Sequence, residues 1–258
     1  MLWEEEDSAE ALASRFGFAK SRSVVEWMRN VMWQAWEIAI DDCDRLIISD
    51  GNLLAWISSN NTRLIMKWSV VSKRFQRLAD TTSLIMWLHD HSIPVAAPIP
   101  ARDGQLRVQR DDVSIGVFPV VEGDLLDIDD PIQVAAAGKM LAILHETMAA
   151  YPFDIDGDHP SDDKQLIHND FRSANILQSG SRITAILDFE DAAYKTRISD
   201  LARATVMLGT RYRNWQPTDQ GVRETFISAY HDQSPLTRGE TNNLRQLIAN
   251  VAKTFGWE

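Results

Sequence analysis

Residues 166–191 read LIHNDFRSANILQSGSRITAILDFED, and three acid or amide side chains within them set the expectation for the rest of the chain. These are Asp170, Asn175 five residues later, and Asp188 at the end of the next apolar run. A turn-like segment at 178–182, followed by alternating apolar residues, predicts a β-hairpin. Such a hairpin places Asn175 and Asp188 at adjacent strand ends, where their oxygen atoms can hold a divalent cation.

The order and spacing of these groups match the chemistry of phosphoryl transfer. In protein kinases an Asp orients or accepts the proton of the attacking hydroxyl, while a later Asn and the Asp of a D-F-G turn bind Mg²⁺. Here residues 168–175 form H-x-D-x-x-x-x-N, and Asp188 opens D-F-E in place of D-F-G. An isolated acidic turn is usually a solvated loop, but two such motifs in the right order favour a kinase. The predicted catalytic residues are Asp170 and His168. Asp170 acts on the hydroxyl group, and His168 braces the loop. Asn175 and Asp188 are the predicted Mg²⁺ ligands.

The same segment resembles the aminoglycoside phosphotransferase and choline kinase family of small-molecule kinases. Members of that family carry H-G-D or H-N-D, then an Asn, then I-D-F or I-D-Y, and then a D-L-A-like segment. This chain has H-N-D at 168–170, L-D-F at 187–189 and D-L-A at 200–202. Asn169 and Glu190 resemble the choline kinases more than the antibiotic kinases, so the motif leaves the acceptor open.

The resemblance implies a two-lobed, protein-kinase-like α+β fold. It places an antiparallel β-sheet lobe that binds ATP or GTP at residues 1–121, and a mainly helical lobe for catalysis and substrate binding at 122–258. The implied reaction moves the γ-phosphoryl group to a hydroxyl of a small molecule. The leading candidate for this acceptor is an aminoglycoside-type or other cationic antibiotic. Two alternatives remain: a metabolic choline, homoserine or sugar kinase, and a catalytically silent nucleotide-binding pseudokinase.

Lys67 is the predicted phosphate ligand of the N-terminal lobe. It lies between Met66 and Trp68 on a short apolar run. A lone ammonium group on such a strand is costly to bury without an anionic partner, so we expect it to meet a phosphate or a carboxylate. An edge-strand lysine that reaches solvent is the alternative. Residues 72–91 have apolar side chains at helical spacing. The resemblance makes Asp80 on this helix the acid partner of Lys67, and a solvated helix residue without that role is the alternative.

The remainder of the N-terminal lobe is expected to be β-hairpins. From residue 23 to residue 68 the pattern changes to short apolar runs broken by turns. The turn that covers the nucleotide phosphates has two candidates, residues 49–52 and residues 29–32. Neither contains the glycines of G-x-G-x-x-G.

The apolar, β-branched run at 113–121 is the predicted last strand and hinge of this lobe. In the family, backbone groups at this point contact the nucleotide base. The resemblance therefore assigns nucleotide binding to Pro119 and Val121.

The C-terminal lobe is expected to be helical. Asp130 followed by proline predicts the start of a long helix, on which His145 is expected to be packed or hydrogen-bonded rather than a ligand. Asp200 is expected to cap the next helix and to tie the catalytic loop in place, and two more helices follow. Glu190 and Asp191 are the predicted substrate-binding residues, because acidic groups attract a cation.

Composition limits the partners. The 258 residues are 45% hydrophobic, which is enough for a sizeable core. The net charge of −11, without a block of Lys or Arg, argues against nucleic acid and suits a cationic acceptor. No run approaches the roughly 20 apolar residues of a membrane span, and the first residues are acidic where a signal peptide is basic. We therefore expect a cytoplasmic protein without a membrane partner.

Overall fold

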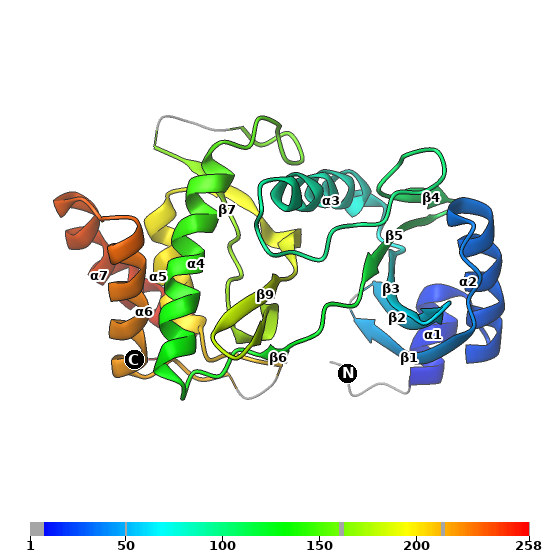
Figure 1. Cartoon of the computed structure of the whole chain (residues 1–258), viewed down its shortest axis with the longest axis horizontal. Helices are drawn as coiled ribbons and strands as arrows, with labels where there is room; N and C mark the ends of the chain where they lie inside the picture. Colours follow the sequence, from blue (N-terminus) through cyan, green and yellow to red (C-terminus); the bar gives the residue numbers. More distant parts are fainter. Residues whose placement is uncertain (1–7, 50, 160–162, 213–214, 258) are drawn as a thin grey trace. The chain divides into compact units, whose positions relative to one another are not determined.

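The computed structural model describes residues 8–49, 51–159, 163–212 and 215–257, and the chain divides into two compact units. The first unit comprises residues 1–86 and 96–120, and the second comprises residues 87–95 and 121–258 (Figure 1). That the first unit binds nucleotide and the second carries catalysis stays a prediction.

The first unit is built on a five-stranded antiparallel sheet with the order β1-β2-β3-β5-β4. The strands are β1 (Asp42–Ser49), β2 (Asn52–Ser59), β3 (Thr62–Ser69), β4 (Val108–Arg110) and β5 (Val113–Pro119). Asn60 and Asn61 form the turn between β2 and β3 with φ 48° and 62°, a conformation that Asn tolerates and that suits a tight hairpin. The hairpins predicted after residue 41 are confirmed.

Helices cover one face of this sheet. The inward residues of β2 and β3 alternate along each strand and pack with α1 (Ser8–Phe16) and α2 (Ser21–Trp36) in one apolar core. In α2 the buried residues Val24, Met28 and Val31 recur at helical spacing. The expectation of β-structure from residue 23 is therefore wrong for this segment. Residues 29–32 lie inside α2, so they do not form the turn over the phosphates.

The helix expected at 72–91 is confirmed. A 3₁₀ turn, η1 (Ser72–Arg74), leads into α3 (Phe75–Asp90), whose apolar side is buried at Leu78, Leu84 and Leu88. The residues of α3 up to 86 belong to the first unit, and its last residues belong to the second.

The second unit is mainly helical, as predicted. Its helices are α4 (Pro131–Ala149), α5 (Arg197–Met207), α6 (Gln220–Gln233) and α7 (Arg238–Thr254). Asp130 caps α4 by accepting the Ile132 N–H at 2.9 Å. α4 runs beside α6 (Figure 1), and Gly138 permits the contact, because a Cβ atom there would lie 2.4 Å from the Phe226 carbonyl oxygen.

Two small sheets in the second unit carry the motif segment. Strands β6 (Asp124–Leu125), β8 (Ile176–Ser179) and β9 (Arg182–Ile186) form one, and β7 (Gln165–Ile167) pairs with β10 (Ala193–Lys195) in the other. Two 3₁₀ turns, η2 (Ser173–Asn175) and η3 (Phe189–Asp191), flank the β8–β9 hairpin. The motif residues therefore lie at strand ends and in tight turns.

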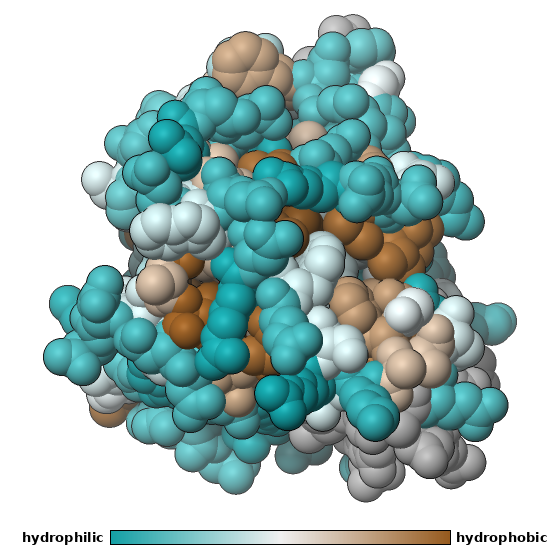
Figure 2. Space-filling view, turned by 90° about the vertical axis from the view of Figure 1, so that its right-hand side faces the viewer, coloured by the Kyte–Doolittle hydropathy of each residue, from teal (hydrophilic) through white to brown (hydrophobic). Residues whose placement is uncertain are grey.

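Hydrophilic side chains dominate the face that Figure 2 shows, with smaller hydrophobic areas among them. Within the described part of the chain, no helix combines the length and the apolar character needed to cross a membrane.

Candidate active site

Asn175 and Asp188 lie at neighbouring ends of the β8–β9 hairpin. Ile176 pairs with Ile186 in the register, and the Leu187 N–H donates to the Asn175 carbonyl oxygen at 2.8 Å. Asp188 has φ 62° and ψ 71°, a left-handed conformation that is uncommon for a residue with a side chain, and the chain turns there into η3. The hairpin predicted from the sequence is confirmed, and the side chain of Asp188 at its end is exposed.

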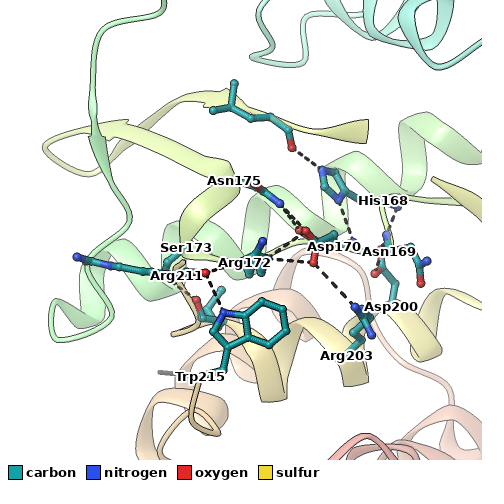
Figure 3. Close-up of polar contacts among 12 residues, drawn as sticks. His168, Asn169, Asp170, Arg172, Ser173, Asn175, Asp200, Arg203, Arg211 and Trp215 are labelled. Carbon is teal, nitrogen blue, oxygen red and sulfur yellow. Dashed lines mark hydrogen bonds and ion pairs between the residues drawn. The ribbon is translucent and has the colours of Figure 1, made fainter. Parts of the chain in front are cut away.

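His168 is buried, and its two ring nitrogens have different partners (Figure 3). Nε2 lies 3.0 Å from the Leu187 carbonyl oxygen, and Nδ1 lies 3.2 Å from the backbone nitrogen of Asp170. A carbonyl oxygen only accepts and a backbone N–H only donates, so these partners select the neutral ring with its hydrogen on Nε2. His168 thereby ties the loop of residues 168–175 to the strand end that precedes Asp188.

One buried carboxylate, that of Asp200, holds the start of this loop. Its oxygens accept the backbone N–H groups of His168 and Asn169 at 3.1 and 3.0 Å. Nε2 of His145 lies 3.0 Å from Oδ2 of Asp200, and Nδ1 of His145 lies 2.8 Å from the Tyr230 hydroxyl. Burial raises the pKa of Asp200, but the hydrogen bond and charge of His145 lead the effects that outweigh burial. The pKa of Asp200 is therefore lowered from its ordinary value of 3.8.

The position of Asp200 in its helix differs from the expectation. α5 begins at Arg197 with Thr196 as its N-cap residue, so Asp200 lies inside the first turn and does not cap the helix. Its side chain is directed at the loop N–H groups instead, which confirms that it ties the loop in place. His145 is hydrogen-bonded in the core, as predicted.

Asp170 lies among several donors (Figure 3). Nε of Arg172 is 3.1 Å from Oδ1 and 3.0 Å from Oδ2, and Nδ2 of Asn175 is 2.7 Å from Oδ2. Nη2 of Arg203 lies 4.0 Å from Oδ1. The side chain of Asp170 is 14% exposed. The structure thus brings Asp170, His168 and Asn175 into direct contact.

The groups beside Asp170 have the chemistry of a magnesium site. Because Nδ2 of Asn175 donates to the Asp170 carbonyl and carboxylate oxygens, the amide oxygen of Asn175 is turned away from them. That oxygen and the Asp188 carboxylate are hard ligands of the kind that Mg²⁺ prefers. Among the described residues, no group of three His, Cys, Asp or Glu side chains could hold a metal ion. A Mg²⁺ ion with two protein ligands would complete its shell with water and phosphate oxygens, which is usual for Mg²⁺ in kinases.

Asn169 has a backbone conformation that glycine also adopts. Its φ is 66°, in the left-handed region that Gly adopts freely and Asn adopts more readily than most residues. Nδ2 of Asn169 donates to the Asp191 carbonyl oxygen at 3.1 Å, and Nζ of Lys195 donates to Oδ1 of Asn169 at 3.1 Å. The predicted substrate residues Glu190 and Asp191 lie in η3. The hydrogen bond from the Asn169 side chain to Asp191 joins η3 to the loop of residues 168–175.

The predicted nucleotide residues belong mostly to the first unit. Lys67 is half-buried on β3, where the register pairs it with Leu54 and Gly116. Asp80 lies on α3 and accepts a hydrogen bond from Gln76 at 2.8 Å.

The predicted hinge lies where the first unit ends. Pro119 ends β5, and Val121 begins the second unit. The pairing of Lys67 with Asp80 and the base contacts of Pro119 and Val121 stay predictions.

The β1–β2 turn at 49–52 stays a candidate for the phosphate-covering turn, although Asp50 lies outside the described residues. The Gly51 carbonyl oxygen accepts the Val70 N–H at 3.1 Å, which fixes the turn against the end of β3. Gly51 has φ 79°, and a Cβ atom there would lie 2.4 Å from the Val71 side chain. The turn therefore requires glycine.

Sequence reasoning missed the arginine residues around Asp170. They are Arg172, Arg203 and Arg211. Arg172 is inside the motif and contacts Asp170 two residues earlier, but the partners that hold its guanidinium group lie about forty positions later. No local pattern in the sequence carries that information.

A model of the phosphotransferase enzyme family matches residues 156–241. No curated protein matches the chain in sequence.

Solved structures give the clearest likeness. The spectinomycin phosphotransferase solved with ADP and spectinomycin is 14% identical, with a TM-score of 0.61 over 87% of this chain and 93% of that one. The macrolide 2′-phosphotransferase from Brachybacterium faecium is 14% identical, with a TM-score of 0.66 over 91% of each chain. A microcompartment-associated aminopropanol kinase is 17% identical, with a TM-score of 0.56 over 88% of this chain and 95% of that one.

At these identities the likeness establishes the fold, and the predicted protein-kinase-like α+β class is confirmed. The segment that carries the motifs lies within the family match. The resemblance predicted from the motifs is thereby confirmed: over residues 156–241 the chain is similar to the phosphotransferase enzyme family, and in fold it is similar to antibiotic phosphotransferases.

Proposed function

We propose that the protein is a small-molecule kinase that moves the γ-phosphoryl group of ATP or GTP to a hydroxyl group. The observation that carries this proposal is the contact of Asp170 with Asn175, beside the hairpin end that bears Asp188. A carboxylate next to two hard oxygen ligands is the arrangement that phosphoryl transfer requires. The family match over the same segment supports it.

In the proposed reaction, the acceptor oxygen bonds to the γ-phosphorus while its proton passes to the Asp170 carboxylate. The bond between the γ-phosphorus and the β–γ bridging oxygen breaks, and the nucleoside diphosphate leaves. Mg²⁺, held by Asn175 and Asp188, would neutralise charge on the phosphates. Lys67 is the proposed phosphate contact of the first unit. The remaining work of the protein is positioning, which can supply several kcal/mol.

The proposed acceptor is an amine-bearing alcohol, in the first instance an aminoglycoside-type antibiotic. The similar structures include a spectinomycin phosphotransferase and an aminopropanol kinase, and the name of the second indicates an amine-bearing acceptor. Glu190 and Asp191 are the proposed cation-binding groups. There are two alternatives. The first is a metabolic choline, homoserine or sugar kinase, and the second is a catalytically silent nucleotide-binding pseudokinase.

The first test is Mg²⁺-dependent release of ADP and GDP with a panel of acceptors. The panel contains aminoglycosides, macrolides, choline, aminopropanol, homoserine and neutral sugars. Replacement Asp170→Asn keeps the shape of the side chain but removes the base, and it is expected to lower turnover about 10²- to 10⁴-fold. Asp129→Asn, an exposed residue before α4, is the matched control and should leave turnover unchanged.

Three outcomes separate the candidates. Release that depends on the acceptor and on Asp170 establishes the kinase and names its acceptor class. Release that survives Asp170→Asn within a few fold contradicts the base assignment. Thermal stabilisation by nucleotide without release, for every acceptor in the panel, favours the pseudokinase.

A further inference from the structure

The carboxylate of Asp170 is engaged unequally at its two oxygens. Oδ2 receives two donors within 3.0 Å, Nε of Arg172 at 3.0 Å and Nδ2 of Asn175 at 2.7 Å. Oδ1 receives Nε of Arg172 at 3.1 Å, so the single Nε hydrogen is shared between the two oxygens. Nη2 of Arg203 lies 4.0 Å from Oδ1, which is too long for a hydrogen bond. Oδ1 therefore has fewer close donors than Oδ2, and keeps a lone pair that no donor among the described residues within hydrogen-bond distance fully occupies.

Arg172 is itself held in place by the segment after α5 (Figure 3). Its Nη1 donates to the Arg211 carbonyl oxygen, and its guanidinium carbon lies 5.2 Å from the centre of the Trp215 ring. The indole N–H of Trp215 donates to the same carbonyl oxygen at 3.1 Å. The Arg172 side chain is only 10% exposed. A guanidinium group that is stacked, hydrogen-bonded and nearly buried has little freedom to rotate.

We propose that Arg172 is a positioning residue, held by Arg211 and Trp215, that orients the Asp170 carboxylate so that Oδ1 takes the proton. This inference rests on the proposed kinase function. In the transfer step, the proton of the acceptor hydroxyl moves to Oδ1 as the oxygen–phosphorus bond forms and the nucleoside diphosphate departs. Without Arg172 the carboxylate keeps one donor, Asn175, and can rotate away from the productive geometry. A displacement of about 1 Å costs up to about a hundredfold in rate.

The test compares kcat and KM in four variants, with the acceptor that the panel identifies. Arg172→Met, which keeps most of the apolar stem, is expected to lower kcat about 10- to 100-fold and to leave the KM for ATP within about threefold. Arg172→Lys should recover only part of the loss, because an ammonium group lacks the planar fork. Trp215→Ala should lower kcat by a smaller factor. The double variant Arg172→Met with Trp215→Ala should resemble Arg172→Met alone, because Trp215 acts through Arg172.

Arg22→Met is the matched control. Nε of Arg22 contacts the Glu26 carboxylate at 3.1 Å, the same chemistry in an exposed helical pair, and its loss should leave kcat unchanged. Thermal unfolding of each variant separates a folding defect from a positioning defect. If Arg172→Met does not fold, the test uses Trp215→Ala, at a half-buried position, and the conservative variant Arg172→Lys.

Each result has a distinct meaning. A kcat for Arg172→Met within about threefold of wild type, or multiplicative losses in the double variant, would overturn the positioning role and leave the kinase intact. An equal fall in kcat and rise in KM for ATP would also overturn it, because nucleotide binding would then depend on Arg172. Wild-type protein that transfers phosphate to no acceptor would remove the proposed function, and the positioning role with it.

Discussion

At the scale of single residues, the loop geometry depends on the Asp200 carboxylate more than on any side chain that would touch a substrate. Its oxygens accept two loop N–H groups and contact His145, and it is fully buried. Asp200→Asn would place an amide NH₂ group where a carboxylate oxygen now accepts hydrogen bonds. At least one donor that faces it, a loop N–H group or His145, would then lose its acceptor. We expect a loss of about 2–4 kcal/mol in the free energy of unfolding and a large fall in turnover. Urea denaturation at pH 7 measures the first, with the exposed Asp232→Asn as control.

The same variant has a pH signature. The folded-state pKa of Asp200 lies below its ordinary value of 3.8, so the carboxylate contributes stability above that value and loses it as the pH falls further. The difference between wild type and Asp200→Asn should therefore shrink as the pH falls below 3.8. A difference that stayed constant down to pH 2 would show that the charge of Asp200 does not contribute.

The residue scale also shows what a sequence can and cannot indicate. Asp170, Asn175 and Asp188 stand out because their types and spacing repeat a known chemical arrangement. Arg172 lies among them without a signal of its own, since its partners Arg211 and Trp215 are about forty residues away. Local patterns carry no information on such contacts.

At the scale of elements, an ion pair joins α7 to α5. Arg197 on α5 contacts both oxygens of Glu240 on α7 at 2.7 and 2.9 Å, and Glu240 also completes a capping box with Thr237. The Arg197 hydrogen bond is the main reason that the pKa of Glu240 is lowered from 4.5 to about 2. Because this folded-state pKa is depressed, the pair stabilises the protein above pH 4.5 and is lost as the pH falls from 4.5 towards 2.

Glu240→Gln tests this docking. At pH 7 it should lower the free energy of unfolding by about 1–2 kcal/mol, because it removes the charge from a partly buried pair that solvent screens and weakens the cap. At pH 2 to 3 most of that difference should disappear. Denaturant unfolding at several pH values measures it, and Glu146→Gln on the exposed side of α4 is the control. An undiminished difference at low pH would assign the loss to packing instead.

The presence of an element was predictable where one pattern dominates. The short apolar runs of β2 and β3, bounded by turns, and the apolar spacing in α3, α4, α6 and α7 each predict the observed element. In α2 the helical spacing of Val24, Met28 and Val31 merges with the alternation of Trp36, Ile38 and Ile40 beyond its end, and the second pattern suggests β-structure. Glu37, with φ 56°, ends the helix at the point where the two patterns meet.

At the scale of the whole molecule, the kinase-like class was predictable from one short segment because that chemistry has a characteristic order of residues. The acceptor was not, since no spacing of residues in the sequence selects the groups that would contact it. The net charge of the chain also bears on the identity of the acceptor. At −11 the protein should attract cations at long range, and salt should weaken that attraction.

Salt dependence therefore distinguishes the proposed acceptor classes. For an aminoglycoside with several ammonium groups, kcat/KM at saturating ATP should fall several-fold between about 25 and 300 mM NaCl, because screening shortens from about 20 Å to about 6 Å. For a neutral sugar it should stay nearly constant. Steady-state kinetics at the two NaCl concentrations measures the change. Sucrose at matched osmolality controls for effects other than screening. If the neutral and the cationic acceptor showed the same dependence, the charge of the protein would play no part in choosing its substrate, and the proposed cationic acceptor would lose its electrostatic support.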